Sequence, residues 1–141
     1  MPTLGWITPH PAPPRTRVFV MASRFELKSL SNVPRFLLKS LSSWSQVKTA
    51  RGAYGASLIA QPFSRVFYTL SAWEDRSALY AYAKADPHGD AMRAMRPACR
   101  RSTFVFWEAD SSELPIGWDE AKRRLADKAD EDAASAGGRA A

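Results

Sequence analysis

The order of hydrophobic and polar positions predicts four strands in the central part of this chain. Apolar residues alternate over 17–27 as in a strand, and both faces of that strand begin apolar. Three shorter segments are also predicted to be strands: 52–61, 66–73 and 102–109. A tight link at 62–65 joins the second and third strands, so these two are predicted to pair as an antiparallel hairpin.

A helix is predicted between the first two strands, beginning near Ser31 and Asn32 with a proline in its first turn. Its core-facing positions are predicted from their spacing along the helix: Val33, Leu37, Leu41, Trp44 and Lys48. The polar positions between them are expected to face solvent: Arg35, Lys39, Ser42 and Gln46.

A second helix is predicted over 76–85, with Asp75 as its N-cap. Asp86 and Pro87 interrupt the helical pattern. A further short helix is predicted from His88 until Pro97 ends it, because proline cannot continue a helix.

The resulting order is βαββαβ, which predicts an α+β, ferredoxin-like fold: a four-stranded antiparallel sheet with helices on one face. The strands carry apolar residues on both faces, so the second face is expected to be uncovered in a single copy. A two-fold homodimer would bury these faces against each other as a dimeric α+β barrel.

The two ends of the chain differ from this central part. Residues 1–16 hold five of the ten prolines and are predicted to be a flexible arm that forms neither helix nor sheet. Residues 17–127 are predicted to be a single domain, in which a C-terminal helix packs Trp118, Ala121 and Leu125 on the body. Residues 128–141 are a low-complexity segment and are predicted to be a disordered tail.

Composition and charge exclude several classes of protein. The chain is 45% hydrophobic, as in a globular protein with a core, and its lone cysteine excludes an internal disulfide. The net charge of +6 is unevenly divided, because residues 1–107 hold 15 Lys and Arg against five acids. These basic residues are scattered over several elements, so nucleic acid is not a predicted partner. Salt-dependent binding of DNA or RNA would instead favour an interaction domain.

Other sequence signals of location and chemistry are absent. No apolar run approaches the roughly 18 residues that a membrane helix needs, so we expect no membrane association and a cytoplasmic protein. There is no glycine-rich phosphate loop, Cys-x-x-Cys pair or His-x-x-x-His pair. A nucleotide enzyme and a metal site are therefore not predicted.

One segment resembles a known superfamily. The strand end Phe67-Tyr-Thr-Leu-Ser-Ala-Trp73-Glu-Asp, with Pro87-His88 ahead of Met92-Arg93, is similar to the dimeric α+β barrel superfamily, typified by the antibiotic-biosynthesis monooxygenases. The same phrase also resembles spheroidene monooxygenase and its bacterial relatives. The resemblance covers about 17–109. It implies an aromatic-lined pocket between sheet and helices that binds a small hydrophobic, aromatic or polyketide-like molecule.

Two functions remain open under this resemblance. Monooxygenases of this branch use no metal or flavin, so a cofactor-independent small monooxygenase is the first hypothesis. Other branches place haem in the same cavity with a histidine as its axial ligand. The alternative is therefore a non-catalytic or haem-binding dimeric barrel that holds a hydrophobic ligand.

His88 is the first candidate for a catalytic residue. An imidazole can act as a general base near neutral pH, or it can ligate haem iron. The competing interpretation is a helix N-terminal residue that is hydrogen-bonded or exposed. Met92 and Met95 share a helical face with His88, where they could contact a substrate but are more typical of a core.

Further candidates come from the strands and the first helix. Trp73 shares a strand face with Ser71 and could either close a pocket over a planar ligand or complete the core. Trp44 is expected to point inward from the first helix. Tyr68 could present its hydroxyl to a substrate oxygen or to solvent. Arg24, on a half-buried strand face, needs either an internal carboxylate or an anionic ligand, and we predict it as a second catalytic residue that steadies negative charge.

Overall fold

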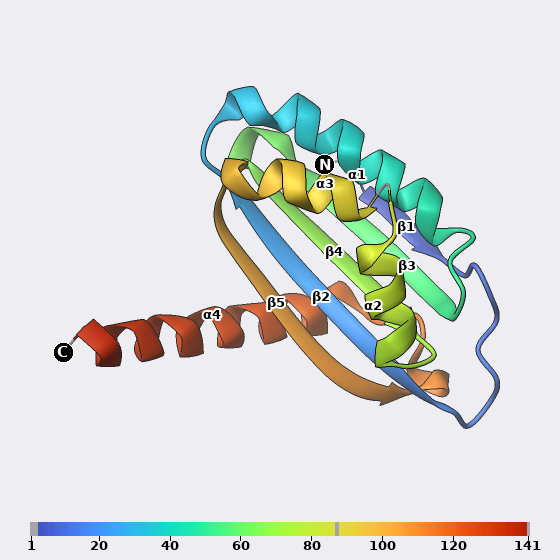
Figure 1. Ribbon diagram of the computed structural model, residues 1–141. Coiled ribbons are helices and arrows are strands. Elements are labelled where there is room, and N and C mark those ends of the chain that lie inside the picture. Colours follow the sequence, from blue (N-terminus) through green and yellow to red (C-terminus); the bar gives the residue numbers. More distant parts are fainter. Residues whose placement is uncertain (1–2, 87, 141) are drawn as a thin grey trace.

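The computed structural model describes residues 3–86 and 88–140 (Figure 1). Pro87, at the predicted interruption between helices, lies outside the described residues, as do the first two residues of the arm and the last of the tail. The described chain forms five strands: β1 (Thr3–Ile7), β2 (Arg17–Leu27), β3 (Ala53–Gln61), β4 (Val66–Trp73) and β5 (Cys99–Asp110). It forms four α-helices: α1 (Val33–Val47), α2 (Arg76–Lys84), α3 (His88–Met95) and α4 (Trp118–Ala140).

One antiparallel sheet contains these strands in the order β1-β3-β4-β2-β5. The predicted α+β class is confirmed, and so is the antiparallel arrangement of the four predicted strands, which are β2, β3, β4 and β5. The predicted number of four strands is wrong, because the sheet has five. The additional strand is β1, whose Thr3 lies opposite Ile59 on the outer side of β3. Residues 3–7 contain no proline, and the next one along the chain is Pro9. Every residue of this stretch therefore has a backbone N–H group that can hydrogen-bond to a neighbouring strand.

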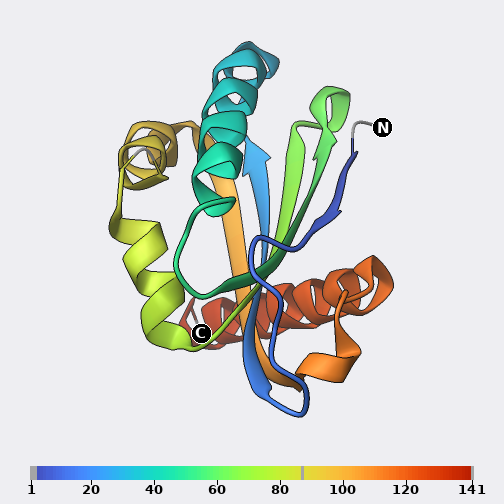
Figure 2. The ribbon, with the colours of Figure 1, turned by 90° about the vertical axis from the view of Figure 1, so that its right-hand side faces the viewer.

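Helices α1, α2 and α3 cover one face of the sheet, and α4 crosses the opposite face (Figure 2). Two buried clusters lie under α1 to α3. One joins Phe36 of α1 and Met95 of α3 to Phe25 and Phe67 of the sheet. The other joins Trp73 of β4 to side chains from α1 and α2.

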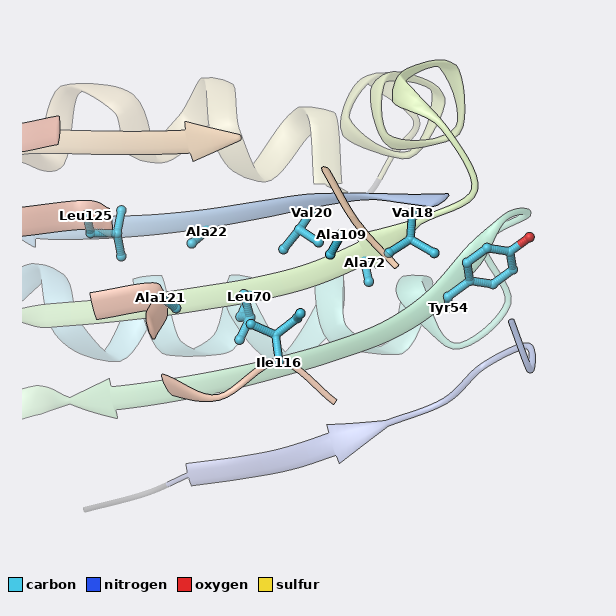
Figure 3. Close-up of a cluster of buried hydrophobic side chains, with 10 residues drawn as sticks. All are labelled: Val18, Val20, Ala22, Tyr54, Leu70, Ala72, Ala109, Ile116, Ala121 and Leu125. Carbon is cyan, nitrogen blue, oxygen red and sulfur yellow. The ribbon is translucent and has the colours of Figure 1, made fainter. Parts of the chain in front are cut away.

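The sheet face opposite α1–α3 is packed within the single chain. Ile116, Ala121 and Leu125 lie on it against Val18 and Val20 of β2, among other strand residues (Figure 3). The expectation of an uncovered face is therefore wrong, because the predicted contact of α4 with the body occurs on this face. The homodimer that would have buried the face stays a prediction.

Helix α4 is longer than the sequence predicted. It continues to Ala140, past position 127 where the folded domain was predicted to end. Residues 131–135 are exposed, and Figure 1 shows the C-terminal part of α4 extending past the edge strand β5. An ion pair between Lys128 and Asp132, with N and O 3.2 Å apart, links successive turns of this exposed part.

The inward face of α1 differs from the predicted stripe. Its buried residues are Val33, Phe36 and Val47, whereas Leu41 is 43% exposed and Lys48 is also exposed. At about 100° per residue, a spacing of four positions drifts steadily round the helix, so Leu41 is turned about 80° from Val33. The face of α1 that packs on the sheet includes Phe36 and Val47 and lies on the opposite side of Val33 from Leu41.

None of the helices in the described part of the chain combines the length and the apolar character that crossing a membrane requires.

Candidate functional site

A cavity of about 350 Å³ lies between the sheet and helices α1, α2 and α3. Its floor is formed by residues that alternate along the strands and point to the helices: Met21, Ser23, Phe25, Ala56, Leu58, Thr69, Ser71, Trp73, Phe104 and Phe106. The three helices contribute the walls. The lining is mainly apolar and aromatic, and its polar groups are hydroxyls, the His88 imidazole and the charged groups of Lys39 and Arg96.

Five of the predicted site residues line this cavity. They come from three different elements: Trp44 from α1, Ser71 and Trp73 from β4, and His88 and Met92 from α3. The sequence placed each of these elements within a few residues of its observed position. The pairing of the strands and the packing of the helices then bring the five side chains around one space.

Arg24 and Tyr68 do not line the cavity. They lie opposite each other on β2 and β4, with the Arg24 guanidinium carbon 6.0 Å from the centre of the Tyr68 ring. Both belong to the face that α4 covers, where the Tyr68 ring meets Trp118 edge to face at 6.1 Å. Strand alternation explains the result, because Ser23 faces the cavity and its neighbour Arg24 must face the other way. The prediction that Arg24 steadies charge beside His88 is therefore wrong on geometry.

Two hydrogen bonds fix the position of His88 at the start of α3. Its backbone N–H donates to Oε1 of Gln46 on α1 at 2.8 Å, and its Nδ1 lies 3.0 Å from the carbonyl oxygen of Ala83. A carbonyl oxygen can only accept, so Nδ1 carries the proton in the neutral ring. The other ring nitrogen, Nε2, keeps its lone pair and has no hydrogen-bond partner among the described residues.

The environment of His88 favours the neutral ring. Burial lowers the pKa of His88 below the ordinary value of 6.5, and the hydrogen bond to Ala83 partly opposes this by raising it. The imidazole is therefore uncharged at pH 7, with its proton on the nitrogen that faces the backbone. A ring in this form can accept a proton through Nε2.

A close approach of the chain at the α2–α3 junction requires a glycine after His88. A Cβ atom on Gly89 would lie 2.6 Å from the carbonyl oxygen of Lys84, which is closer than side chains tolerate. The Gly89 N–H also donates to the carbonyl oxygen of Ala85 at 2.9 Å. The junction is thereby tight enough to place the His88 ring against α2.

Three rings are in tilted contact with one another along one side of the cavity. The Tyr82 ring lies 4.7 Å from the His88 ring and 5.0 Å from the Trp73 ring, measured between centroids. Tyr82 donates its hydroxyl to the carbonyl oxygen of Ser43 at 2.9 Å, and burial raises the pKa of Tyr82. The Tyr82 hydroxyl is therefore neutral and already engaged, so it supports His88 by packing rather than by proton transfer.

Hydroxyl groups form a polar strip on the otherwise apolar cavity floor. Ser23 and Thr69 face each other across β2 and β4, and their hydroxyls are hydrogen-bonded. Ser71 accepts a hydrogen bond from Nε1 of Trp73 at 2.8 Å. Each hydroxyl can also bond a ligand oxygen.

The residues of this site that sequence reasoning missed include Gln46, Tyr82 and Thr69. Gln46 was expected to face solvent, because its helical position was judged against the wrong stripe of α1. Thr69 left a signal that could have been used, since it is a polar residue on a strand face whose other members are mostly apolar. Nothing in the sequence indicated that Tyr82 would contact His88.

Within residues 3–86 and 88–140, no group of three or more His, Cys, Asp and Glu side chains lies close enough to hold a metal ion. His88 is a donor whose chemistry fits an axial haem ligand, since its Nδ1–H is fixed by a carbonyl and its Nε2 is available.

Comparisons with solved structures identify the fold of the chain. No protein-family model matches the chain, and no curated protein matches it. Solved structures do match. An antibiotic biosynthesis monooxygenase aligns with a TM-score of 0.58 at 14% identity, covering 64% of this chain and 97% of that one.

The chain has the fold of an antibiotic biosynthesis monooxygenase. SnoaB, a cofactor-independent oxygenase from Streptomyces nogalater, matches with a TM-score of 0.55 at 13% identity, covering 70% of this chain and 97% of that one. A conserved protein from Methanosarcina mazei Go1 matches with a TM-score of 0.57 at 10% identity, covering 64% and 90%.

These matches confirm the predicted resemblance to the antibiotic-biosynthesis-monooxygenase fold. At identities of 10–14% they establish the fold alone. The closer likeness to spheroidene monooxygenase stays a prediction.

Proposed function

We propose that this protein is a small monooxygenase-like enzyme, which acts on a hydrophobic aromatic or polyketide-like substrate in the cavity between sheet and helices. The observation that carries the proposal is the neutral His88 ring, whose Nε2 lone pair is unused beside a cavity of about 350 Å³. The fold supports the same class, since the matching structures include a cofactor-independent oxygenase.

The proposed reaction begins with proton abstraction. Nε2 of His88 takes the proton from an acidic hydroxyl of the enol form of the substrate, which leaves a delocalised anion. The anion passes one electron to O₂, and the resulting substrate radical and superoxide combine at the ring carbon that carries one hydrogen. The peroxide, once protonated by His88, loses water and becomes a ketone. One oxygen atom of O₂ ends in the product and the other in water.

The surrounding residues serve this chemistry in three ways. The apolar lining excludes water, which strengthens the contacts made by the few polar groups inside. Trp73 presents a buried ring for stacking on a planar substrate. Ser71, and whichever hydroxyl of the Ser23–Thr69 pair does not donate within the pair, can donate to the substrate oxygen on which negative charge develops. In this scheme the hydroxyls take the role that the sequence had suggested for Arg24.

The test uses anthrone, a tricyclic compound with an enolisable CH₂ group, as the probe substrate. We expect O₂ uptake in an electrode with wild type, and incorporation of one atom of isotopically labelled O₂ into the product. Removing a general base typically costs about 10²–10⁴ in rate, so His88→Asn is expected to lose at least about 100-fold. His10→Asn, in the N-terminal segment, is the matched control. Equal rates for wild type and His88→Asn would refute the proposal.

One observation favours a second function. A histidine with Nδ1–H on a backbone carbonyl and Nε2 available is the arrangement found in metal-ligating histidines, so a haem-binding barrel without turnover is the alternative. Haem, if bound, would be held through Nε2 of His88 and would supply an iron that can bind a small molecule. Addition of haemin to the purified protein distinguishes the two functions. A Soret band that shifts on binding and is lost in His88→Ala supports the alternative, and an unchanged spectrum of free haemin excludes it.

A further inference from the structure

We propose that the ligand of this cavity is an amphiphilic anion, with an apolar body inside the cavity and one negatively charged group directed to Lys39 and Arg96. This inference rests on the proposed function, because it names the class of substrate for the same cavity. It begins from the charges of the lining. Lys39 and Arg96 are the lining residues that carry a full positive charge at pH 7, and the lining includes no Asp or Glu.

The two cations belong to neighbouring elements of the fold. Lys39 is one helical turn after Phe36 on α1, and Arg96 directly follows Met95 at the end of α3. Phe36 and Met95 belong to one buried cluster, so α1 and α3 are packed together there. The two side chains therefore reach the cavity from adjacent elements.

Both cations are without an internal counter-charge. Neither forms an ion pair with a described residue. Arg93 provides a contrast one turn earlier on α3. It does not line the cavity, and its guanidinium is paired with Asp86 at 3.2 Å and Asp90 at 2.6 Å. Unlike Arg93, the two cations at the cavity are therefore available to an anionic ligand.

The wider charge distribution points in the same direction. Residues 1–107, which include every residue that lines the cavity, carry 15 Lys and Arg against five acids. A surplus of positive charge around a cavity with low-dielectric walls attracts anions to it and raises the local anion concentration.

An apolar body for the ligand is indicated by exposed rings at the cavity. Phe104 and Phe106 on β5 are 36% and 45% exposed, and Tyr80 on α2 is 44% exposed, although all three line the cavity. Large aromatic groups left in contact with water beside a cavity are typical of a surface that a ligand covers. Rings beside unpaired cations fit a molecule with a flat apolar part and an acidic group.

The experiment compares two fluorescent probes that share one apolar body. Anilinonaphthalene sulfonate carries a sulfonate, and N-phenylnaphthylamine is the same ring system without it. For wild type we expect the sulfonate to bind at least about tenfold more tightly, a difference of about 1.4 kcal/mol. The double variant Lys39→Gln/Arg96→Gln is expected to lose this preference while its affinity for the neutral probe changes less than about twofold.

Three controls make the result specific. The double variant Arg35→Gln/Lys84→Gln removes two exposed cations that do not line the cavity, and it is expected to keep the preference. Ser40→Phe places a ring in the cavity lining and is expected to weaken both probes. Circular dichroism verifies that each variant is folded. A double variant that does not fold is replaced by its two single substitutions.

The inference is overturned if wild type binds both probes equally or binds neither. It is also overturned if Lys39→Gln/Arg96→Gln retains the preference, if the Arg35/Lys84 control loses as much of it, or if Ser40→Phe leaves both affinities unchanged. His88→Asn is expected to preserve the preference. Anion preference without His88-dependent O₂ uptake would therefore refute the proposed reaction and leave the ligand class standing.

Discussion

Gln46 of α1 holds the first residue of α3 in place, because its side-chain Oε1 accepts the backbone N–H of His88 at 2.8 Å. The same side chain donates through Nε2 to the carbonyl oxygens of Tyr82 at 3.1 Å and Ala85 at 3.3 Å. One amide thus satisfies three backbone groups where α2 ends and α3 begins. The position of the His88 ring therefore depends on the packing of α1 as well as on its own helix.

Gln46→Leu tests this positioning role. The substitution leaves the His88 N–H and two carbonyl groups without partners, and each unsatisfied buried group typically costs about 1–3 kcal/mol. We expect the free energy of unfolding, measured with urea, to fall by at least about 1 kcal/mol. We also expect the NMR titration of His88 to move, which a purely structural loss elsewhere would not cause. Ser45→Ala, at an exposed neighbouring position, is the control and should change neither quantity.

The lowered pKa of His88 predicts how stability depends on pH. Burial makes the folded protein harder to protonate at His88 than the unfolded chain, so protons favour unfolding. The free energy of unfolding should therefore decrease as pH falls from about 6.5 through the lower folded pKa, by about 1.4 kcal/mol for each pKa unit of depression. We expect His88→Gln to show a shallower decrease than wild type between pH 7.5 and pH 5.

Urea unfolding at several pH values measures this slope, and the difference between wild type and variant removes the contribution of the carboxylates that titrate in the same range. Identical slopes for wild type and His88→Gln would contradict the buried, neutral His88.

Trp6 of β1 lies directly over Gly55 of β3. A Cβ atom on Gly55 would come within 1.8 Å of Cζ2 of Trp6, so Gly55→Ala cannot be accommodated unless the indole moves. Overpacking of this kind typically costs about 1–3 kcal/mol. We expect Gly55→Ala to destabilise the protein by that amount and to speed hydrogen exchange of the β1 amides. Gly5→Ala, with no atom within 4 Å of the added Cβ, should do neither.

Leu125 of α4 is 2% exposed and packs on the sheet face opposite the cavity. Removing a buried leucine side chain typically costs about 2–5 kcal/mol, so Leu125→Ala should lower the urea midpoint markedly. Leu38→Ala removes the same atoms from a residue that is 69% exposed and should have little effect. Similar losses for the two variants would show that α4 does not pack on the sheet as described.

A second copy of the chain remains the predicted partner. The edge strand β5 carries the exposed rings of Phe104 and Phe106, and the outer side of an edge strand has backbone groups open to pairing. We expect light scattering at micromolar concentration to give about twice the 15.7 kDa mass of one chain. A stable monomer under these conditions would exclude the dimer.

The sequence was sufficient for the elements that carry a strong local pattern. Strand alternation placed β4 within its observed bounds and assigned Ser71 and Trp73 to the face that lines the cavity. The predicted cap Asp75 is observed to accept the N–H of Ala78 at 2.9 Å. Capping and alternation are properties of a few neighbouring residues, so they can be recognised without knowing the rest of the fold.

The errors arose where one segment depends on another. Residues 3–7 became a strand because the outer edge of β3 offered them partners, and a proline-rich neighbourhood concealed that possibility. The stripe of α1 was misplaced because several rotations of an amphipathic helix look similar in sequence, and only contact with the sheet selects one. Gln46 and Lys39 were misassigned for the same reason.

The sequence by itself determined the α+β class, the antiparallel hairpin, the residues that face each way along the strands and the identity of the candidate base. Only the tertiary structure decided that α4 covers the second sheet face, that Arg24 and Tyr68 are separated from the cavity, and that Gln46 holds His88. Short-range steric and hydrogen-bonding rules act along the chain and are visible in it. The contacts that assemble a site join residues far apart in sequence, and these are fixed only when the layers pack.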